Sequence, residues 1–515
     1  MNFQESNDIQ SSPRALTTVL STLLILVLMA ICSPQAQAAA EEKNLDYSVI
    51  ETIPIFHQER AKPLDTFARE TMRLISGREK WKNPKEGDDR LSRAPMTNLL
   101  SMLFEADEWR DIPVIHIDKA NVKKEVLGMD GKAEWISYED LKTNPGFVST
   151  LDTIRKKHRE SEDGKPKLTP VERKVSDLQG VLNRMDSIFY GTAFTVVPVE
   201  HNGVPGWLSL QEMADSGQDE ALRTELAGLM TSFQEGDKVE FLRSSKDLSR
   251  TLREKGHDHY PTMGVLGQEL TYNKIKPFRV SWEFLLIASI LFGVSMGISS
   301  KITYFGGWAL FLIGFGYCGY GLLLRVMVAG RPPVSNMYES VIYMGWGVLL
   351  FAGIFEAVYR QRIFALCGSV MGIIVLIMAD MLPFDPEISP LVPVLRSNYW
   401  LIIHVMTIVN SYSAFALAMV IAHFSLGHYL FAPHKKTLIR TINNFVYRSI
   451  QLGVLLLAAG TILGGVWANE SWGRFWGWDP KETWAFISLM GYLALLHARF
   501  AGMVGAFGTA VGAIL

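Results

Sequence analysis

The sequence predicts a mainly α-helical protein in which a polytopic membrane bundle follows an N-terminal polar domain. Of the 515 residues, 48% are hydrophobic and only 20% are charged, whereas soluble globular chains carry about 25% charged residues. The charged residues are concentrated in 41–280, and long apolar runs separated by short polar loops fill 281–515. The length therefore fits one polar domain, 41–280, followed by one membrane domain, 281–515.

The first 40 residues have the pattern of a targeting segment. Arg14 precedes an apolar stretch, 16–31, and Ala36-Gln37-Ala38 follows it as a small-residue cleavage site. We predict that 1–40 is either a cleaved signal peptide or an uncleaved signal anchor. Both alternatives place 41–280 on the extracytoplasmic side of the membrane.

The polar domain, 41–280, is predicted to be an extracytoplasmic α+β domain. Segments 92–107 and 209–233 have helical periodicity, and 192–200 is typical of a strand. A net charge of -2 gives no basic field, which excludes nucleic-acid binding. Cys32, Cys318 and Cys367 form no CxxC pair, which excludes a disulfide scaffold and a thiolate zinc site.

The membrane domain is predicted to contain about eight spanning helices, since a bilayer requires roughly 20 apolar residues for each span. The apolar segments are 283–300, 304–327, 338–358, 363–381, 399–425, 448–467, 484–498 and 501–515. Threading them from an extracytoplasmic residue 280 puts Lys301, Arg360 and the basic cluster 435–440 in the cytoplasm, as the positive-inside tendency requires. The loops 382–398 and 468–483 then lie outside. We therefore predict a multi-pass protein of the inner (plasma) membrane.

The segment 467–484, which we call the Trp loop, contains five of the 13 tryptophans of the chain. Tryptophan favours membrane interfaces, so an aromatic belt is one interpretation. A belt would be spread over many helix ends, however, and here the rings are concentrated in one loop with two glycine spacers. Aromatic faces close to Arg474 and Lys481 suit a planar apolar ligand that carries carboxylates, and haem is such a ligand.

Three motifs in 281–515 carry a family resemblance. The string WGRFWGWDPKETW, 472–484, resembles the WWD signature of haem-handling membrane proteins, and its PKET continuation is similar to the CcsA/ResC branch of cytochrome c biogenesis (System II). RPPVSNMYES, 331–340, and NYWLIIH, 398–404, resemble the same branch. Outside the membrane domain, QERAKPLDTFA, 58–68, is similar to an N-terminal extension of some long members.

The resemblance implies a haem-handling subunit of a cytochrome c synthase. Such a subunit holds haem at the external Trp loop for covalent attachment to the CxxCH motif of apocytochrome c, with a CcsB/ResB-like subunit as a further partner. One alternative is a haem exporter or chaperone without synthase activity, which would share the same residues. Another is a b-haem electron-transfer membrane protein, which would require histidine pairs on facing helices. No acid, base or nucleophile is apparent, so no catalytic residue is assigned and enzyme activity stays open.

The resemblance also implies site residues. His404 matches the first external axial ligand of the family, and a hydrogen-bonded interfacial histidine is the alternative. His497 matches the intramembrane histidine of the family, and His423 lies near its depth as a candidate partner or as a histidine that faces a neighbouring helix. A second external ligand would follow the Trp loop, and none is found up to Leu515.

The predicted haem-binding residues are His404, Trp467, Trp472, Arg474, Trp476, Trp478, Asp479, Lys481, His497 and His423, with His404 and His497 as iron ligands. In this arrangement Trp472, Trp476 and Trp478 would cover the porphyrin ring. Asp479 would orient the loop, and the two cations would pair with the propionates.

Overall fold

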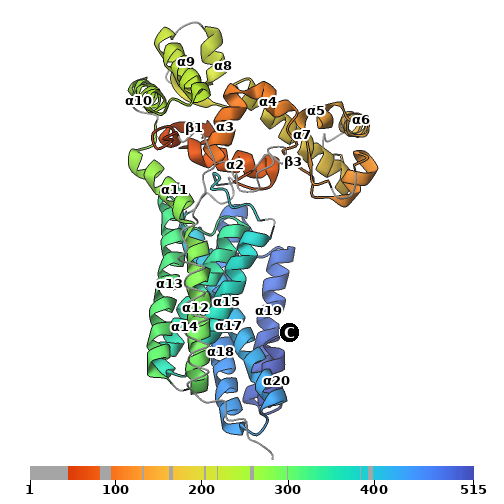
Figure 1. Ribbon diagram of the computed structural model, residues 1–515. Coiled ribbons are helices and arrows are strands. Elements are labelled where there is room, and N and C mark those ends of the chain that lie inside the picture. The colour runs from red at the N-terminus through yellow and green to blue at the C-terminus, as the bar shows by residue number, and fades with distance from the viewer. Residues whose placement is uncertain are drawn as a thin grey trace, which may run out of the picture. The chain divides into compact units, whose positions relative to one another are not determined.

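The computed structural model describes residues 45–81, 94–129, 133–161, 166–201, 204–216, 219–255, 260–298, 300–382, 384–391 and 398–515. The predicted signal segment, 1–40, lies outside these residues. The chain forms two compact units, one within Ala38–Lys274 and one that contains Ile275–Leu515 (Figure 1). We call them the polar unit and the bundle.

The polar unit combines helices with three two-stranded antiparallel sheets. The sheets pair β1 (Pro54–His57) with β2 (Arg60–Pro63), β3 (Ile115–His116) with β4 (Trp135–Ile136), and β5 (Thr195–His201) with β6 (Val204–Ser209). The helices are η1 (Ile50–Thr52), α2 (Leu64–Ser76), α3 (Pro95–Phe104), α4 (Ala106–Arg110), η3 (Val122–Val126), α5 (Tyr138–Thr143), α6 (Pro145–Glu160), α7 (Pro170–Phe189), α8 (Leu210–Ser216), α9 (Glu220–Glu235), α10 (Lys238–Lys255) and α11 (Met263–Ile275). The predicted helical segments correspond to α3 with α4 and to α8 with α9, and the predicted strand corresponds to β5.

The segment 58–68 forms the turn of the β1–β2 hairpin, strand β2 and the first turns of α2. Lys62 Nζ lies 2.5 Å from Glu70 Oε2, and both side chains are buried. Arg60 makes a two-pronged ion pair with Glu269 of α11, with its nearer contact at 2.7 Å. A buried charge is costly unless it is paired. These charges therefore help to specify how the hairpin and α11 meet within the polar unit.

The bundle contains the long apolar helices. Its elements are α12 (Pro277–Ile298), α13 (Lys301–Ala329), α14 (Met337–Tyr359), α15 (Ile363–Met381), α16 (Asn398–Trp400), the π-helix η5 (Leu401–Val405), α17 (Met406–Phe431), α18 (Lys436–Trp472), α19 (Pro480–Phe500) and α20 (Ala506–Gly512). Six helices of the described chain are long and apolar enough to cross a membrane: Met263–Ile298, Lys301–Ala329, Met337–Tyr359, Ile363–Met381, Ile402–Phe431 and Lys436–Trp472. The prediction of a helical, multi-pass membrane bundle is confirmed.

The last two of the eight predicted spans differ from the first six. Segment 484–498 lies in α19, which has 21 residues but is not among the six apolar helices. Segment 501–515 contains α20, which has seven residues. A helix of that length is about 10 Å long, whereas the hydrocarbon core of a bilayer is about 30 Å thick. Length and composition therefore support six of the eight spans.

Successive helices of the bundle alternate in direction and pack side by side (Figure 1). α12 packs against α13 and α15, α14 against α15 and α17, and α18 against α17 and α19. Because the direction alternates, the ends of α13, α15 and α18 meet the beginnings of α14, η5 and α19 at one end of the bundle. We call this the Trp end, since it carries the Trp loop.

Candidate functional site

The backbone of the Trp loop is held by two carboxylates. α18 ends at Trp472, after which Gly473 adopts a left-handed conformation with φ 69°. The carboxylate of Asp479 accepts hydrogen bonds from the backbone N–H groups of Lys481 (2.8 Å) and Glu482 (3.0 Å), and so caps α19. Glu482 Oε2 accepts a further hydrogen bond from the Gly477 N–H at 2.6 Å. These hydrogen bonds therefore fix the backbone conformation of the loop.

Trp478 occupies an unusual backbone conformation inside this loop. Its φ is 57°, in the left-handed region that costs a bulky residue about 1–2 kcal/mol. Its ring lies 5.8 Å from that of Trp476, and both rings lie edge-on to Phe486. The Trp478 side chain is nevertheless 67% exposed. Strain of this kind is typical of functional sites, and here it holds a large ring out toward the surroundings.

The cations of the loop lie next to these rings. The guanidinium carbon of Arg474 lies 5.9 Å from the centre of the Trp472 ring, which is within the range of a cation–π contact. A Cβ atom added to Gly477 would overlap the Arg474 guanidinium. Gly477 is therefore required for this placement of Arg474. Arg474 and Lys481 are both exposed at the surface of the loop.

His404 lies in the π-helix η5, a rare type of turn that is frequent at functional sites. Its Nδ1 lies 2.8 Å from the carbonyl oxygen of Gly460 in α18. A carbonyl can only accept a hydrogen bond, so Nδ1 carries the proton and the lone pair is on Nε2. The ring is half-buried, and its centre lies 5.6 Å from the ring of Trp467. This tautomer is the one in which Nε2 can bind a metal.

The predicted site residues fall into separate groups. His404 is paired with Trp467, whereas Trp476 and Trp478 form a cluster with Phe486. In the part of the chain that the structure describes, no ring contact joins His404 to Trp472, Trp476 or Trp478. The structure thus brings these residues to the same end of the bundle but does not pack them into one cluster.

The two other predicted histidines are engaged with their own helices. His423 Nδ1 lies 2.9 Å from the Met419 carbonyl oxygen, and His497 Nδ1 lies 2.8 Å from that of Leu493. Both side chains are exposed at the surface of the bundle. Across the described residues no group of three or more His, Cys, Asp or Glu side chains is arranged to hold a metal ion.

Several residues of this region were not found by reasoning from the sequence. The indole N–H of Trp400 donates to Glu470 Oε2 at 2.8 Å and so links the end of α16, directly before η5, to α18. The ring of Phe475 lies against α18 at Gly465. A Cβ atom added to Gly465 would come within 2.6 Å of this ring. The adjacent glycines at 464 and 465 were the available signal, since they allow close approach by other side chains.

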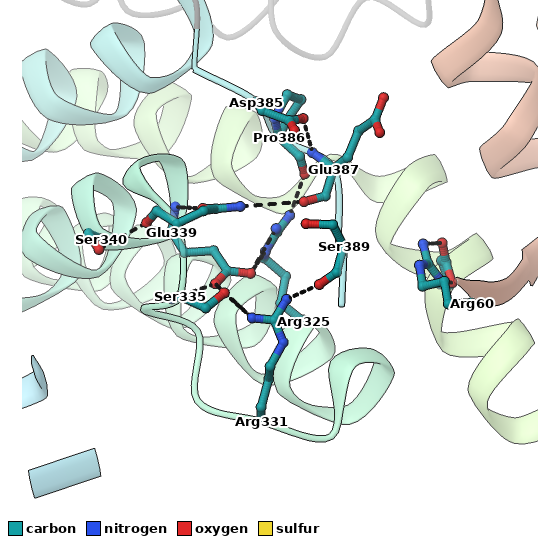
Figure 2. A network of polar contacts seen from close by, with 12 residues as sticks. Arg60, Arg325, Arg331, Ser335, Glu339, Ser340, Asp385, Pro386, Glu387 and Ser389 are labelled. Atoms are coloured by element: carbon teal, nitrogen blue, oxygen red, sulfur yellow. Dashed lines mark hydrogen bonds and ion pairs between the residues drawn. The ribbon is translucent and has the colours of Figure 1, made fainter. Parts of the chain in front are cut away.

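A buried ionic network occupies the Trp end between α13 and α14 (Figure 2). Arg325 Nη2 lies 2.9 Å from Glu339 Oε1, and the two side chains are 0% and 1% exposed. Arg325 donates to the Pro386 carbonyl at 3.0 Å, and Arg331 donates to the Ser389 carbonyl. The backbone N–H and the hydroxyl of Ser335 both donate to the other oxygen of Glu339. Segment 331–340, which carried part of the family resemblance, thus fixes the loop 384–391.

The bundle is similar to known assembly proteins. Residues 334–514 match the family model described as "Cytochrome C assembly protein". The chain is 35% identical to the cytochrome c biogenesis protein CcsA of Guillardia theta over 223 residues, which cover 36% of this chain and 73% of that protein. It is 30% identical to CcsA of Prochlorococcus marinus over 261 residues, which cover 45% of this chain and 83% of that protein.

A longer relative extends the similarity into the polar unit. The chain is 30% identical to protein NrfI of Wolinella succinogenes over 467 residues, which cover 85% of this chain. The aligned region covers 48% of NrfI, so the chain spans about half the length of this relative. These matches confirm the family that the WWD string and segment 331–340 predicted. The chain belongs to the CcsA/ResC type of cytochrome c biogenesis proteins.

Proposed function

We propose that this protein acts in cytochrome c maturation as a haem-handling subunit of a cytochrome c synthase, and that the Trp end holds the haem. The observation that carries the proposal is the state of His404. Its Nδ1–H is engaged with the Gly460 carbonyl at 2.8 Å, which leaves the lone pair on Nε2. A neutral imidazole is the usual protein ligand of haem iron.

The other residues of the Trp end fit the same substrate. Trp472 and Trp478 offer exposed aromatic faces, and such faces stack well on planar rings. Arg474 and Lys481 offer exposed cations, which form charge-assisted hydrogen bonds with carboxylates such as propionates. The indole N–H of Trp476 is buried and has no acceptor in the described part of the chain, and a ligand carboxylate would supply one.

In this proposal, haem is the substrate, and each cysteine thiol of the CxxCH motif of apocytochrome c adds across a vinyl C=C bond of haem: sulfur bonds to one vinyl carbon and the thiol hydrogen goes to the other. The contribution of this chain is to bind and orient. His404 fixes the iron, the tryptophan rings shield the macrocycle from water, and Asp479 fixes the loop by capping α19. Holding reactants in one geometry lowers the entropic part of a barrier. No catalytic residue is assigned, and a CcsB/ResB-like subunit is proposed as a partner.

We place the Trp end and the polar unit on the extracytoplasmic side, with a signal peptide or anchor in 1–40. This orientation keeps Lys301, Arg360 and the cluster 435–440 in the cytoplasm, as the positive-inside tendency favours. Two single-cysteine variants, Glu387→Cys and His434→Cys, test this orientation by labelling with an impermeant maleimide in intact cells. We expect label at 387 only, and the reverse result would contradict the orientation.

A b-haem electron carrier has less support from the geometry. It would require two histidines that face each other across helices, whereas His423 and His497 are both exposed at the surface of the bundle and not enclosed between helices. A haem exporter without synthase activity uses the same residues as the proposed function. Co-expression with an apocytochrome in a host that lacks its own biogenesis system separates these two, since only a synthase yields covalently bound haem.

The direct test is haem content after loss of the imidazole. Wild type, His404→Gly and the control His434→Gly are purified from a haem-producing host, and reduced absorption spectra are recorded per mole of protein. His434 is exposed at the opposite end of the bundle, so its loss should not matter. We expect His404→Gly to lose its Soret band and added imidazole to restore part of it. A wild-type spectrum for His404→Gly would contradict the proposal.

A further inference from the structure

Helices α17 and α18 pack antiparallel along a seam in which glycines of α18 face bulky side chains of α17 and η5. An added Cβ atom would lie 2.5 Å from the Phe415 ring at Gly453, 3.0 Å from Ile408 Cβ at Gly460, and 2.6 Å from His404 Cε1 at Gly464. Steps of seven and then four residues along α18 are matched by equal steps backwards from 415 to 408 to 404. His404 therefore occupies the last position of one continuous packing register.

The imidazole of His404 presents its Nδ1, Cε1 and Nε2 atoms to Gly464. A Cβ atom at this position would be 2.6 Å from Cε1, 3.1 Å from Nδ1 and 3.3 Å from Nε2. Heavy atoms of a packed interior approach to about 3.5–4.0 Å. Any side chain at 464 would therefore push the whole ring away from α18.

The same helix also sets the orientation of the ring through a hydrogen bond. Gly460 lies one turn before Gly464, so the two residues share a face of α18. The Gly460 carbonyl accepts the Nδ1–H of His404 at 2.8 Å. The ring reaches this carbonyl only because Gly464 has no side chain. The contact of His404 with Gly464 and its hydrogen bond to Gly460 thus both depend on the close approach of the imidazole to α18.

We propose that Gly464 is a positioning residue for the iron ligand His404. By lacking a side chain, it allows the imidazole to lie on α18, where the Gly460 carbonyl fixes the tautomer and leaves Nε2 as the ligand atom. This inference rests on the proposed function, since it concerns how His404 binds haem iron. Hydrogen bonds that orient a ligating histidine typically change metal affinity by 10- to 100-fold when they are lost.

The test compares three glycine-to-alanine variants of the full-length protein. Gly464→Ala places a Cβ atom against His404, whereas Gly316→Ala in α13 and Gly491→Ala in α19 place one where nothing lies within 4 Å. We expect about a 10- to 100-fold loss of haem affinity for Gly464→Ala and wild-type affinity for both controls. The haem that Gly464→Ala retains should have a higher midpoint potential, because an imidazole without its Nδ1–H hydrogen bond is a weaker donor. A purely structural role would not change this potential.

A second comparison distinguishes steric displacement of the ring from general damage to the bundle. Gly464→Ala should lower the melting temperature in the wild-type background but have little effect in the His404→Gly background, where the ring is absent. An equal loss of melting temperature in both backgrounds would overturn the inference. So would wild-type haem content in Gly464→Ala when His404→Gly has lost its haem, a result that leaves the proposed function intact. Full haem retention by His404→Gly would instead contradict the proposed function itself.

Discussion

Replacing Glu339 by glutamine tests the buried network of the Trp end, because this carboxylate is shared by two arginines. Arg325 and Glu339 are 0% and 1% exposed, and Arg331 is 7% exposed. Glutamine has the same shape but no charge. Both guanidinium groups would then stay buried after losing the carboxylate that they share.

The expected cost follows from the contacts of the carboxylate. One oxygen accepts from Arg325 Nε and Nη2 at 3.1 and 2.9 Å, and the other accepts from the Ser335 N–H and hydroxyl. A glutamine amide provides an acceptor for only one of these donor pairs and presents N–H groups to the other. Removing one partner of a buried ion pair costs about 3–5 kcal/mol. We expect Glu339→Gln to lose about this much free energy of unfolding.

Two measurements check this expectation. Unfolding of the purified protein in mixed micelles reports its stability, and cleavage after Glu387 by a glutamyl endopeptidase reports opening of the loop 384–391. Glu283→Gln is the control, since it removes a partly exposed i,i+4 pair with Arg279 at 3.0 Å, and such pairs contribute at most about 1 kcal/mol. The reasoning would be refuted if Glu339→Gln unfolded at the wild-type midpoint and was cleaved at the wild-type rate.

Three further outcomes concern the Trp loop and the polar unit. Asp479→Ala should destabilise the first turn of α19 by about 0.5–2 kcal/mol, whereas Asp479→Asn keeps a capping oxygen and should be milder; protease sensitivity of the loop and haem per protein measure both effects. Trp478→Gly should preserve or raise the melting temperature, because glycine adopts a φ of 57° without strain, but it should weaken haem retention. A lower melting temperature together with weaker haem retention would mean that the ring stabilises the fold. Burial, followed by the charges of Arg184, Lys62 and Arg60, lowers the pKa of His57 to about 3. The unfolded state therefore binds more protons below pH ~6.5, so stability should fall as the pH decreases toward 3, and His57→Asn should flatten this part of a melting-temperature profile.

The bundle and the Trp loop were predictable because their signals are local. Six apolar runs identify spanning helices by themselves, and the string 472–484 is contiguous. The cap formed by Asp479 also follows from the Asp-Pro sequence at a helix start. These features depend on neighbouring residues and not on the tertiary structure.

The network and the glycine seam were not predicted, because their meaning depends on residues far away in the sequence. Arg325 and Glu339 lie inside predicted apolar segments, and an isolated charge in such a segment was a signal that was not used. Gly464 is unremarkable in a helix until His404, sixty positions earlier, is placed upon it. The π-turn of η5 likewise has no sequence pattern that distinguishes it from the α-helix that follows.

The length of α18 sets how far the Trp loop lies from the apolar part of the bundle. The helix has 37 residues and is therefore about 55 Å long, roughly 25 Å more than the hydrocarbon core of a bilayer. Its apolar stretch, 448–467, is preceded by 436–447 with Lys436 and Arg440, about 18 Å of helix, and followed by 468–472 with Asn469 and Glu470, about 7–8 Å of helix. The Trp loop therefore begins little more than one helical turn beyond the apolar stretch of α18. In the orientation proposed above, Trp472 and Trp478 would then lie at the polar surface of the membrane, where a water-soluble polypeptide could reach them.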